Sequence, residues 1–185
     1  MKRMKVLSLL VVVAVAVVSC SSQPSAPAAP AAAPGPTPTA HGNLAQVMRG
    51  IPFPASNLIF DTQTNDPGAA AKPGDSGAGA SASAQFSGVY GGWQAVENSG
   101  LALAETANLL LVPGRKCQNG RPVPVEKEDF KKFTQGLIDA GMATYKAAQS
   151  KNLDAMVEVS GTVADACAAC HEVYRDKPTD MERCI

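Results

Sequence analysis

Apolar residues recur at helical spacing through the last part of the chain. From Leu153 to Tyr174 they stand three or four positions apart, which is the spacing that lines one face of an α-helix. No segment alternates apolar and polar residues with the period of two that a half-buried strand shows. The pattern therefore predicts a helix over about 152–175. Its inward stripe is Leu153, Met156, Val157, Ser160, Val163, Ala164, Cys167, Cys170, His171 and Tyr174.

Three earlier segments show the same periodicity. They cover 42–51, about 90–111 and about 126–151. Pro52 and Pro54 should break or kink the first segment, and Ser56 is a candidate start for a further short turn. The core stripe of the segment at about 90–111 is Trp93, Val96, Gly100, Leu103, Ala107 and Leu110. That of the segment at about 126–151 is Phe130, Phe133, Leu137, Gly141, Tyr145 and Ala148.

Four amphipathic helices in about 145 residues predict an all-α fold, an antiparallel four-helix bundle. In such a bundle the start of the first helix and the end of the fourth lie at one end. The Gly/Ala/Ser-rich stretch 65–88 shows no periodicity. We interpret it as a surface insertion, because loop closure entropy grows slowly with length.

The N-terminus predicts export. Lys2, Arg3 and Lys5 precede an apolar run that ends at Ser19, which is typical of a secretory signal over 1–19 and short for a membrane span. The run ends in "VVSC", which resembles a bacterial lipobox. We expect Cys20 to be lipidated and to anchor the protein on the periplasmic side of a bacterial membrane. The alternative is an ordinary signal peptide with Cys20 in an unmodified tail.

A tether follows the predicted anchor. Residues 21–40 hold six prolines and no charge, a composition typical of an extended linker without a core. The folded domain is therefore expected at 41–185, after a lipidated tether over 20–40. Ser21 is not the aspartate that retains some lipoproteins at the inner membrane, which favours the outer membrane.

The charge balance gives no sign of nucleic-acid binding. Without the signal the chain carries 13 Lys and Arg against 16 Asp and Glu, a net charge of about −3. A nucleic-acid-binding domain calls for a basic patch. Membrane attachment would therefore come from the lipid rather than from surface charge.

The motif "CAACH" at 167–171 carries the most specific chemistry. C-x-x-C-H is the attachment signature of c-type haem. The thiols of Cys167 and Cys170 add to the two haem vinyl groups, and His171 becomes the axial ligand of the iron. The sequence therefore predicts one covalent haem c.

Rival uses of these residues fit less well. A redox C-x-x-C calls for a βαβ context, and a zinc site calls for a second ligand pair. His41 and Cys117 are available but lack paired spacing. Ser160 with a histidine committed to iron is no catalytic set, so we do not expect an enzyme.

The stretch "CAACHEVYR", 167–175, together with "IPFPASNLIFD" and "LAETANLLLVPGR", resembles the cytochrome c′ family of class II c-type cytochromes. The resemblance covers about 42–177. It implies a haem inside the bundle, with His171 on one side of the iron and the first helix on the other. Family members often pair, so a homodimer is expected as one option. The tether, the insertion and the extra cysteines depart from the family pattern.

Met48 is the candidate sixth ligand. Counted along antiparallel helices, Met48 and His171 lie at similar depths from the same end of the bundle. A thioether is a known axial partner that raises the haem potential. The alternative is an apolar plug over a five-coordinate iron, and His41 is a rival ligand that precedes the helix.

Charged and aromatic residues are expected near the haem as well. Arg175 either pairs with a haem propionate or satisfies the C-terminal dipole of its helix. Arg115 and Lys116 are expected at the same end of the bundle as solvated surface charges, with contact to the propionates as the alternative. Residues expected to pack near the haem are Phe130, Phe133, Leu109 and Leu110.

Cys117 and Cys184 remain. Both follow helices that end at the haem end of the bundle, and the compartment is oxidising. We predict a disulfide between them, with two free thiols as the alternative.

Three functions of different kinds remain open. The first is single-electron transfer with redox partner proteins. The second is a gas-binding haem module for NO or CO. The third is a structural lipoprotein in which the haem only stabilises the fold.

Overall fold

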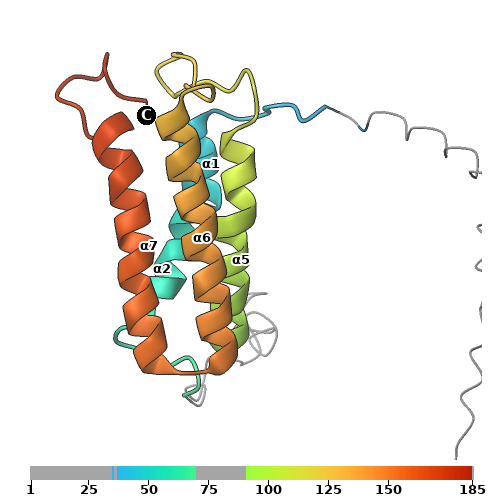
Figure 1. Ribbon diagram of the computed structural model, residues 1–185, viewed down its shortest axis with the longest axis vertical. Helices are drawn as coiled ribbons and strands as arrows, with labels where there is room; N and C mark the ends of the chain where they lie inside the picture. Colours follow the sequence, from blue (N-terminus) through green and yellow to red (C-terminus); the bar gives the residue numbers. More distant parts are fainter. Residues whose placement is uncertain (1–34, 36, 70–90, 185) are drawn as a thin grey trace, which may run out of the picture. The chain divides into compact units, whose positions relative to one another are not determined.

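The computed structural model describes residues 35, 37–69 and 91–184 (Figure 1). The described part is helical and contains no strand; its only bridge pairs Lys116 with Pro122. The helices are α1 (Leu44–Gly50), α2 (Pro52–Asp61), α5 (Gly92–Leu110), α6 (Glu128–Ser150) and α7 (Leu153–Tyr174). Since α2 continues where α1 ends, four helical rods pack against one another.

The first rod is divided where proline dictates. Asn43 and Gln46 form a capping box at the start of α1. Pro52 occupies the first turn of α2, where its fixed φ suits a helix and its missing N–H costs nothing. The expected break is therefore confirmed. The expected restart at Ser56 was wrong, because the helix resumes at Pro52 and runs for ten residues.

The other helices begin and end close to the predicted positions. Lys151 ends α6 in the left-handed conformation, with φ 53°. The side chain of Asn152 accepts a hydrogen bond from the Ala155 backbone N–H and so caps α7. This short connection lays α6 and α7 side by side (Figure 1).

The centre of the fold is a close approach of α5 and α6. A Cβ on Gly100 would lie 2.7 Å from the backbone nitrogen of Tyr145, and one on Gly141 would lie 2.7 Å from the Gly100 carbonyl oxygen. Only glycine permits two helix backbones to approach so closely. Leu103 and Ala140 are buried beside this crossing.

The start of α1, the end of α5, the start of α6 and the end of α7 gather at one end, the upper end of Figure 1. The backbone N–H of Leu44 donates to the Lys116 carbonyl oxygen at 2.8 Å. Cys117 and Cys184 lie at disulfide distance there, with Cα atoms 4.9 Å apart. The predicted pairing has the geometry that it requires.

The stripe of α7 is narrower than predicted. Met156, Ser160 and Val163 are buried, but Val157 is 50% exposed and Ala164 is exposed. Their side of α7 faces solvent, because the neighbouring helices cover only part of its circumference. None of the described helices is long and apolar enough to cross a bilayer. The predicted signal, Cys20, most of the tether and positions 70–88 of the insertion lie outside the described residues.

Candidate functional site

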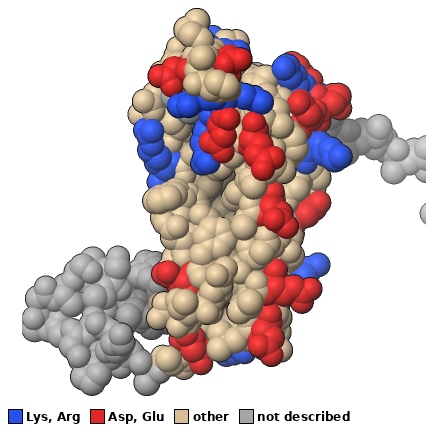
Figure 2. Space-filling model, turned by 90° about the vertical axis from the view of Figure 1, so that its left-hand side faces the viewer, with Lys and Arg blue, Asp and Glu red and all other residues tan. Residues whose placement is uncertain are grey.

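A cavity of about 260 Å³ lies near the end where Cys117 and Cys184 meet. Its walls come from α1, α2, α6 and α7, with Leu110 of α5 also contributing. Most of the lining is apolar. In Figure 2 charged side chains gather toward the upper end of the molecule, and a largely uncharged surface with a recess lies below them. Lining residues include Met48, Leu110, Phe130, Phe133, Cys167, Cys170, His171, Tyr174 and Arg175.

The cavity brings together residues that the sequence singled out from different segments. Cys167, Cys170 and His171 line it from α7, and Met48 lines it from α1. Their shared cavity requires that α1 and the C-terminal half of α7 lie at the same level of the fold. The rival ligand His41 is exposed and precedes the N-cap of α1.

The two thiols are free and partly buried. Burial raises the pKa of Cys167, while burial and the neighbouring Cys167 and Asp129 raise the pKa of Cys170 to about 11. Burial, followed by the charge of Arg175, lowers the pKa of His171. At neutral pH the site therefore holds protonated thiols and a neutral imidazole. A neutral imidazole is the form that binds metals.

An aromatic cluster forms one wall. The Tyr174 ring meets the rings of Phe130 and Phe133 edge to face, with centroids 5.3 and 6.3 Å away. The Tyr174 hydroxyl donates a hydrogen bond to Asp129 Oδ1 at 2.6 Å. The Nζ of Lys127 lies 5.9 Å from the Tyr174 ring centroid, within cation–π range. These contacts fix Tyr174 one helical turn after His171.

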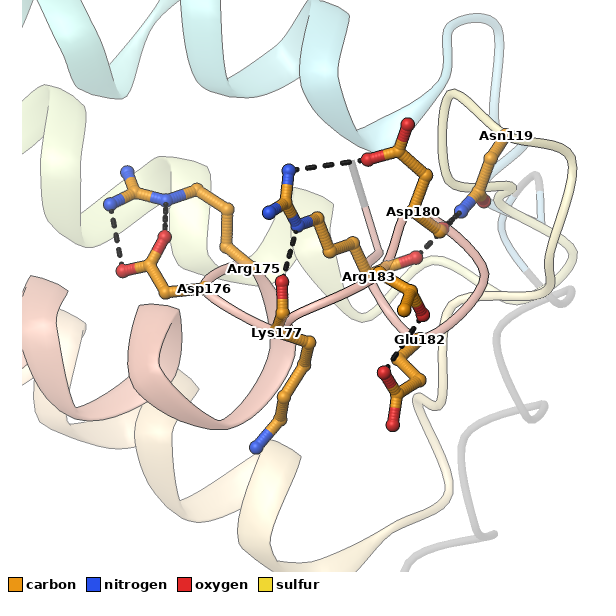
Figure 3. A network of polar contacts seen from close by, with 8 residues as sticks. Asn119, Arg175, Asp176, Lys177, Asp180, Glu182 and Arg183 are labelled. Atoms are coloured by element: carbon orange, nitrogen blue, oxygen red, sulfur yellow. Dashed lines mark hydrogen bonds and ion pairs between the residues drawn. The ribbon is translucent and has the colours of Figure 1, made fainter.

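Arg175 is the C-cap residue of α7 and also lines the cavity. Its guanidinium donates from Nε and Nη2 to the two carboxylate oxygens of Asp176, at 2.6 and 3.0 Å (Figure 3). The side chain is half exposed. Both interpretations of Arg175, partner of an anionic group and cation at a helix C-terminus, are compatible with this position.

The chain after α7 folds back toward the loop between α5 and α6 (Figure 3). The Asn119 Nδ2 donates to the carbonyl oxygens of Asp180 and Arg183, at 2.8 and 2.6 Å. The Cys184 backbone N–H donates to the Tyr174 carbonyl oxygen at 2.7 Å. Cys184 itself lines the cavity, so this tail contributes to the cavity wall.

Sequence reasoning misjudged Arg115. It was expected on the solvated surface, as Lys116 is, but its side chain is only 5% exposed. Its Nε and Nη2 donate to the Leu109 carbonyl oxygen and its Nη1 donates to the Gly42 carbonyl oxygen. No local pattern reveals this burial, because Gly42 is far away along the chain. Leu109, expected near the haem, is 41% exposed and faces away from the core.

Arg49 also lines the cavity and was not singled out. The feature of the sequence that could have pointed to Arg49 was its position directly after Met48, in the segment that forms the short α1. Its Nη1 donates to Gln118 Oε1 at 3.0 Å, so it joins the cavity wall to the loop that follows α5.

Searches against family models, curated proteins and solved structures find no match for this chain. In the described part of the chain, no three His, Cys, Asp or Glu side chains gather closely enough to hold a metal ion by themselves. Function is therefore inferred from the residues of the cavity and from the "CAACH" motif.

Proposed function

We propose that this chain is a c-type cytochrome that carries single electrons. In this proposal an antiparallel four-helix bundle of the cytochrome c′ kind holds one covalent haem c through Cys167 and Cys170, with His171 as axial ligand. The observation that carries it is the cavity: α7 contributes two free thiols and an imidazole to one apolar space, and Met48 lines that space from α1.

The residues present fit such a group. The thiols stand one helical turn apart and are protonated at neutral pH, as their raised pKa values require. The neighbouring imidazole is neutral and able to donate its lone pair. When bound, the haem iron supplies a reversible one-electron change of oxidation state. The apolar walls limit access of water, which is one means by which a protein sets a redox potential.

The setting of the protein is part of the proposal. Cys20 carries the lipid, residues 20–40 form the tether, and the haem domain lies on the periplasmic side, with the outer membrane favoured. Partners are redox proteins reached within the range of the tether, with pairing into a homodimer as an option. Nucleic acid has no part in this function.

The test is a visible spectrum of the purified protein, reduced minus oxidised, with and without CO. Electron transfer predicts reversible cycling of a low-spin haem that resists CO. A haem that neither cycles nor binds CO would instead support a haem-stabilised structural lipoprotein.

A gas-binding module for NO or CO is the second candidate. The observation in its favour is the apolar surroundings of Met48, where Leu44 and Ala45 also line the cavity. Replacing Met48 with Ala separates the two functions. If Met48 is the sixth ligand, the weak long-wavelength band of methionine-ligated ferric haem disappears in Met48→Ala. If wild type is already high-spin and the variant is unchanged, Met48 is an apolar plug and gas binding is favoured.

A further inference from the structure

The loop between α5 and α6 contacts both walls of the cavity. We use the name bracket loop for residues 113–123, which follow α5 and precede α6. Toward α1, its Arg115 Nη1 donates to the Gly42 carbonyl oxygen at 2.6 Å. The carbonyl oxygen of Lys116 accepts the Leu44 backbone N–H at 2.8 Å. These two bonds fix the start of α1.

The far end of α1 is held by the same loop. Gln118 Oε1 accepts a hydrogen bond from Arg49 Nη1 at 3.0 Å. Met48, next to Arg49, therefore lies between two attachment points of the bracket loop. A helix of seven residues has little stability of its own, so its position depends on such attachments and on packing against α2 and α5.

Toward α7, the bracket loop is joined through Cys117 and Asn119. Cys117 pairs with Cys184, and Asn119 donates to the Arg183 carbonyl oxygen. Cys184 in turn donates its backbone N–H to the carbonyl oxygen of Tyr174 in the last turn of α7. One loop therefore connects the wall that carries Met48 with the wall that carries His171.

Arg115 is the buried centre of this arrangement. Its guanidinium donates three hydrogen bonds to two carbonyl oxygens, one at the end of α5 and one before α1. The planar fork of an arginine fixes the positions of such acceptors relative to each other, and a lysine cannot reproduce that geometry. Among the residues that the structure describes, Arg115 is the one buried residue with a charged side chain.

We infer that Arg115 is a positioning residue that sets the place of α1, and with it Met48, across the cavity from His171. The inference rests on the proposed function for its redox meaning. Arg115 does not line the cavity. If the cavity holds a haem, Arg115 would act on it only through the position of α1.

The experiment compares three variants of the full chain with the disulfide intact. Arg115→Met keeps side-chain length and removes the donors, and Arg115→Lys keeps the charge without the fork. The matched control is Lys116→Met, which removes an exposed neighbouring cation; the hydrogen bond to α1 uses the backbone of Lys116 and is retained. The readouts are amide hydrogen exchange over 42–51 and, in the haem-loaded protein, the ferric spectrum and the rate of CO binding to the ferrous haem.

The expected result is faster exchange over 42–51 in Arg115→Met, with loss of the methionine band from the ferric spectrum and faster CO binding to the ferrous haem. Lys116→Met should change neither readout. Faster exchange with an unchanged spectrum and CO rate would reduce Arg115 to a purely structural role and overturn the inference, as would unchanged exchange.

Two further outcomes remain decisive. If Arg115→Met does not fold, Arg115→Lys is compared with wild type and with Lys116→Met by the same readouts. If the wild-type protein carries no covalent haem, the proposed function fails. The exchange measurement still decides whether Arg115 positions α1.

Discussion

The two halves of this domain are held together in different ways. Where α5 and α6 cross, Gly100 and Gly141 bring the backbones into contact and leave no space for even a methyl group. Where α1 and α7 face each other, a cavity of about 260 Å³ separates them. A packed core stabilises itself through its own contacts. A region that contains a cavity lacks part of these packing contacts, so other interactions must hold its helices in place.

Those constraints are covalent and polar. Cys117 pairs with Cys184, Arg115 joins α5 to the start of α1, and Asn119 holds the tail after α7. The cavity is therefore held in shape by the bracket loop, which lies outside its wall, and by the tail, whose Cys184 lines it. The side chains that line the cavity therefore do not have to fill it by packing, and they can include reactive groups.

The disulfide should give the largest effect. The double variant Cys117→Ser with Cys184→Ser opens a loop whose ends are 67 positions apart. In the chain-entropy model this costs about 4 kcal/mol of unfolding free energy. Denaturant unfolding of both proteins measures the loss, and reduction of the wild type should reproduce it.

If both cysteines of the intact, unreduced protein react with a thiol reagent, the pair is not bonded. The cavity half would then depend on hydrogen bonds alone, and the comparison would need revision.

The packed half should be sensitive to a single methyl group. In Gly141→Ala the new Cβ would lie 2.7 Å from the Ala104 backbone nitrogen and from the Gly100 carbonyl oxygen. Overpacking of this kind costs about 1–3 kcal/mol. Gly136→Ala is the matched control in the same helix, because nothing lies within 4 Å of its Cβ. That control should gain about 0.5–1 kcal/mol from helix propensity.

Thermal unfolding of Gly141→Ala and Gly136→Ala measures the difference in stability between them. Equal stabilisation of both would mean that α5 and α6 are not in backbone contact at Gly100 and Gly141. The contrast between a packed and a hollow half would then disappear.

The smallest effect concerns the hydrogen bond between Tyr174 and Asp129. The Tyr174 hydroxyl lowers the pKa of Asp129 in the folded protein. A group with a lowered folded pKa stabilises above its unfolded pKa, about 3.9 for aspartate. That stabilisation is lost as the pH falls through the lowered value. Tyr174→Phe should therefore be slightly less stable than wild type at pH 7, and the difference should shrink in acid.

Unfolding at a series of pH values measures this difference. A gap between wild type and Tyr174→Phe that stays constant down to low pH would show that Asp129 does not contribute through its charge.

The helices that carry the site were predictable because their information is local. Apolar spacing located α5, α6 and α7 to within about two residues at each end. Counting depths along helices expected to be antiparallel predicted that Met48 and His171 lie at the same level, and both residues line one cavity. Each step needs only the helical period and the ends of the segments.

What the sequence did not reveal depends on contacts between distant segments. The burial of Arg115 requires a carbonyl group of Gly42, which no local pattern brings near. The exposure of Val157 depends on which part of α7 its neighbours cover. The cavity-lining role of Arg49 and Cys184 appears only when α1 and the tail are placed in space.

In the proposed function, Cys167 and Cys170 bind a haem covalently. The most direct measurement is acid–acetone extraction of the purified protein, followed by mass spectrometry of the peptide that contains 167–171. We predict that the colour stays with the protein and that this peptide carries the mass of haem on both cysteines, while a Cys167→Ser, Cys170→Ser double variant loses it. Colour that passes entirely into the acetone, with both thiols of the wild-type peptide unmodified, would contradict the proposal.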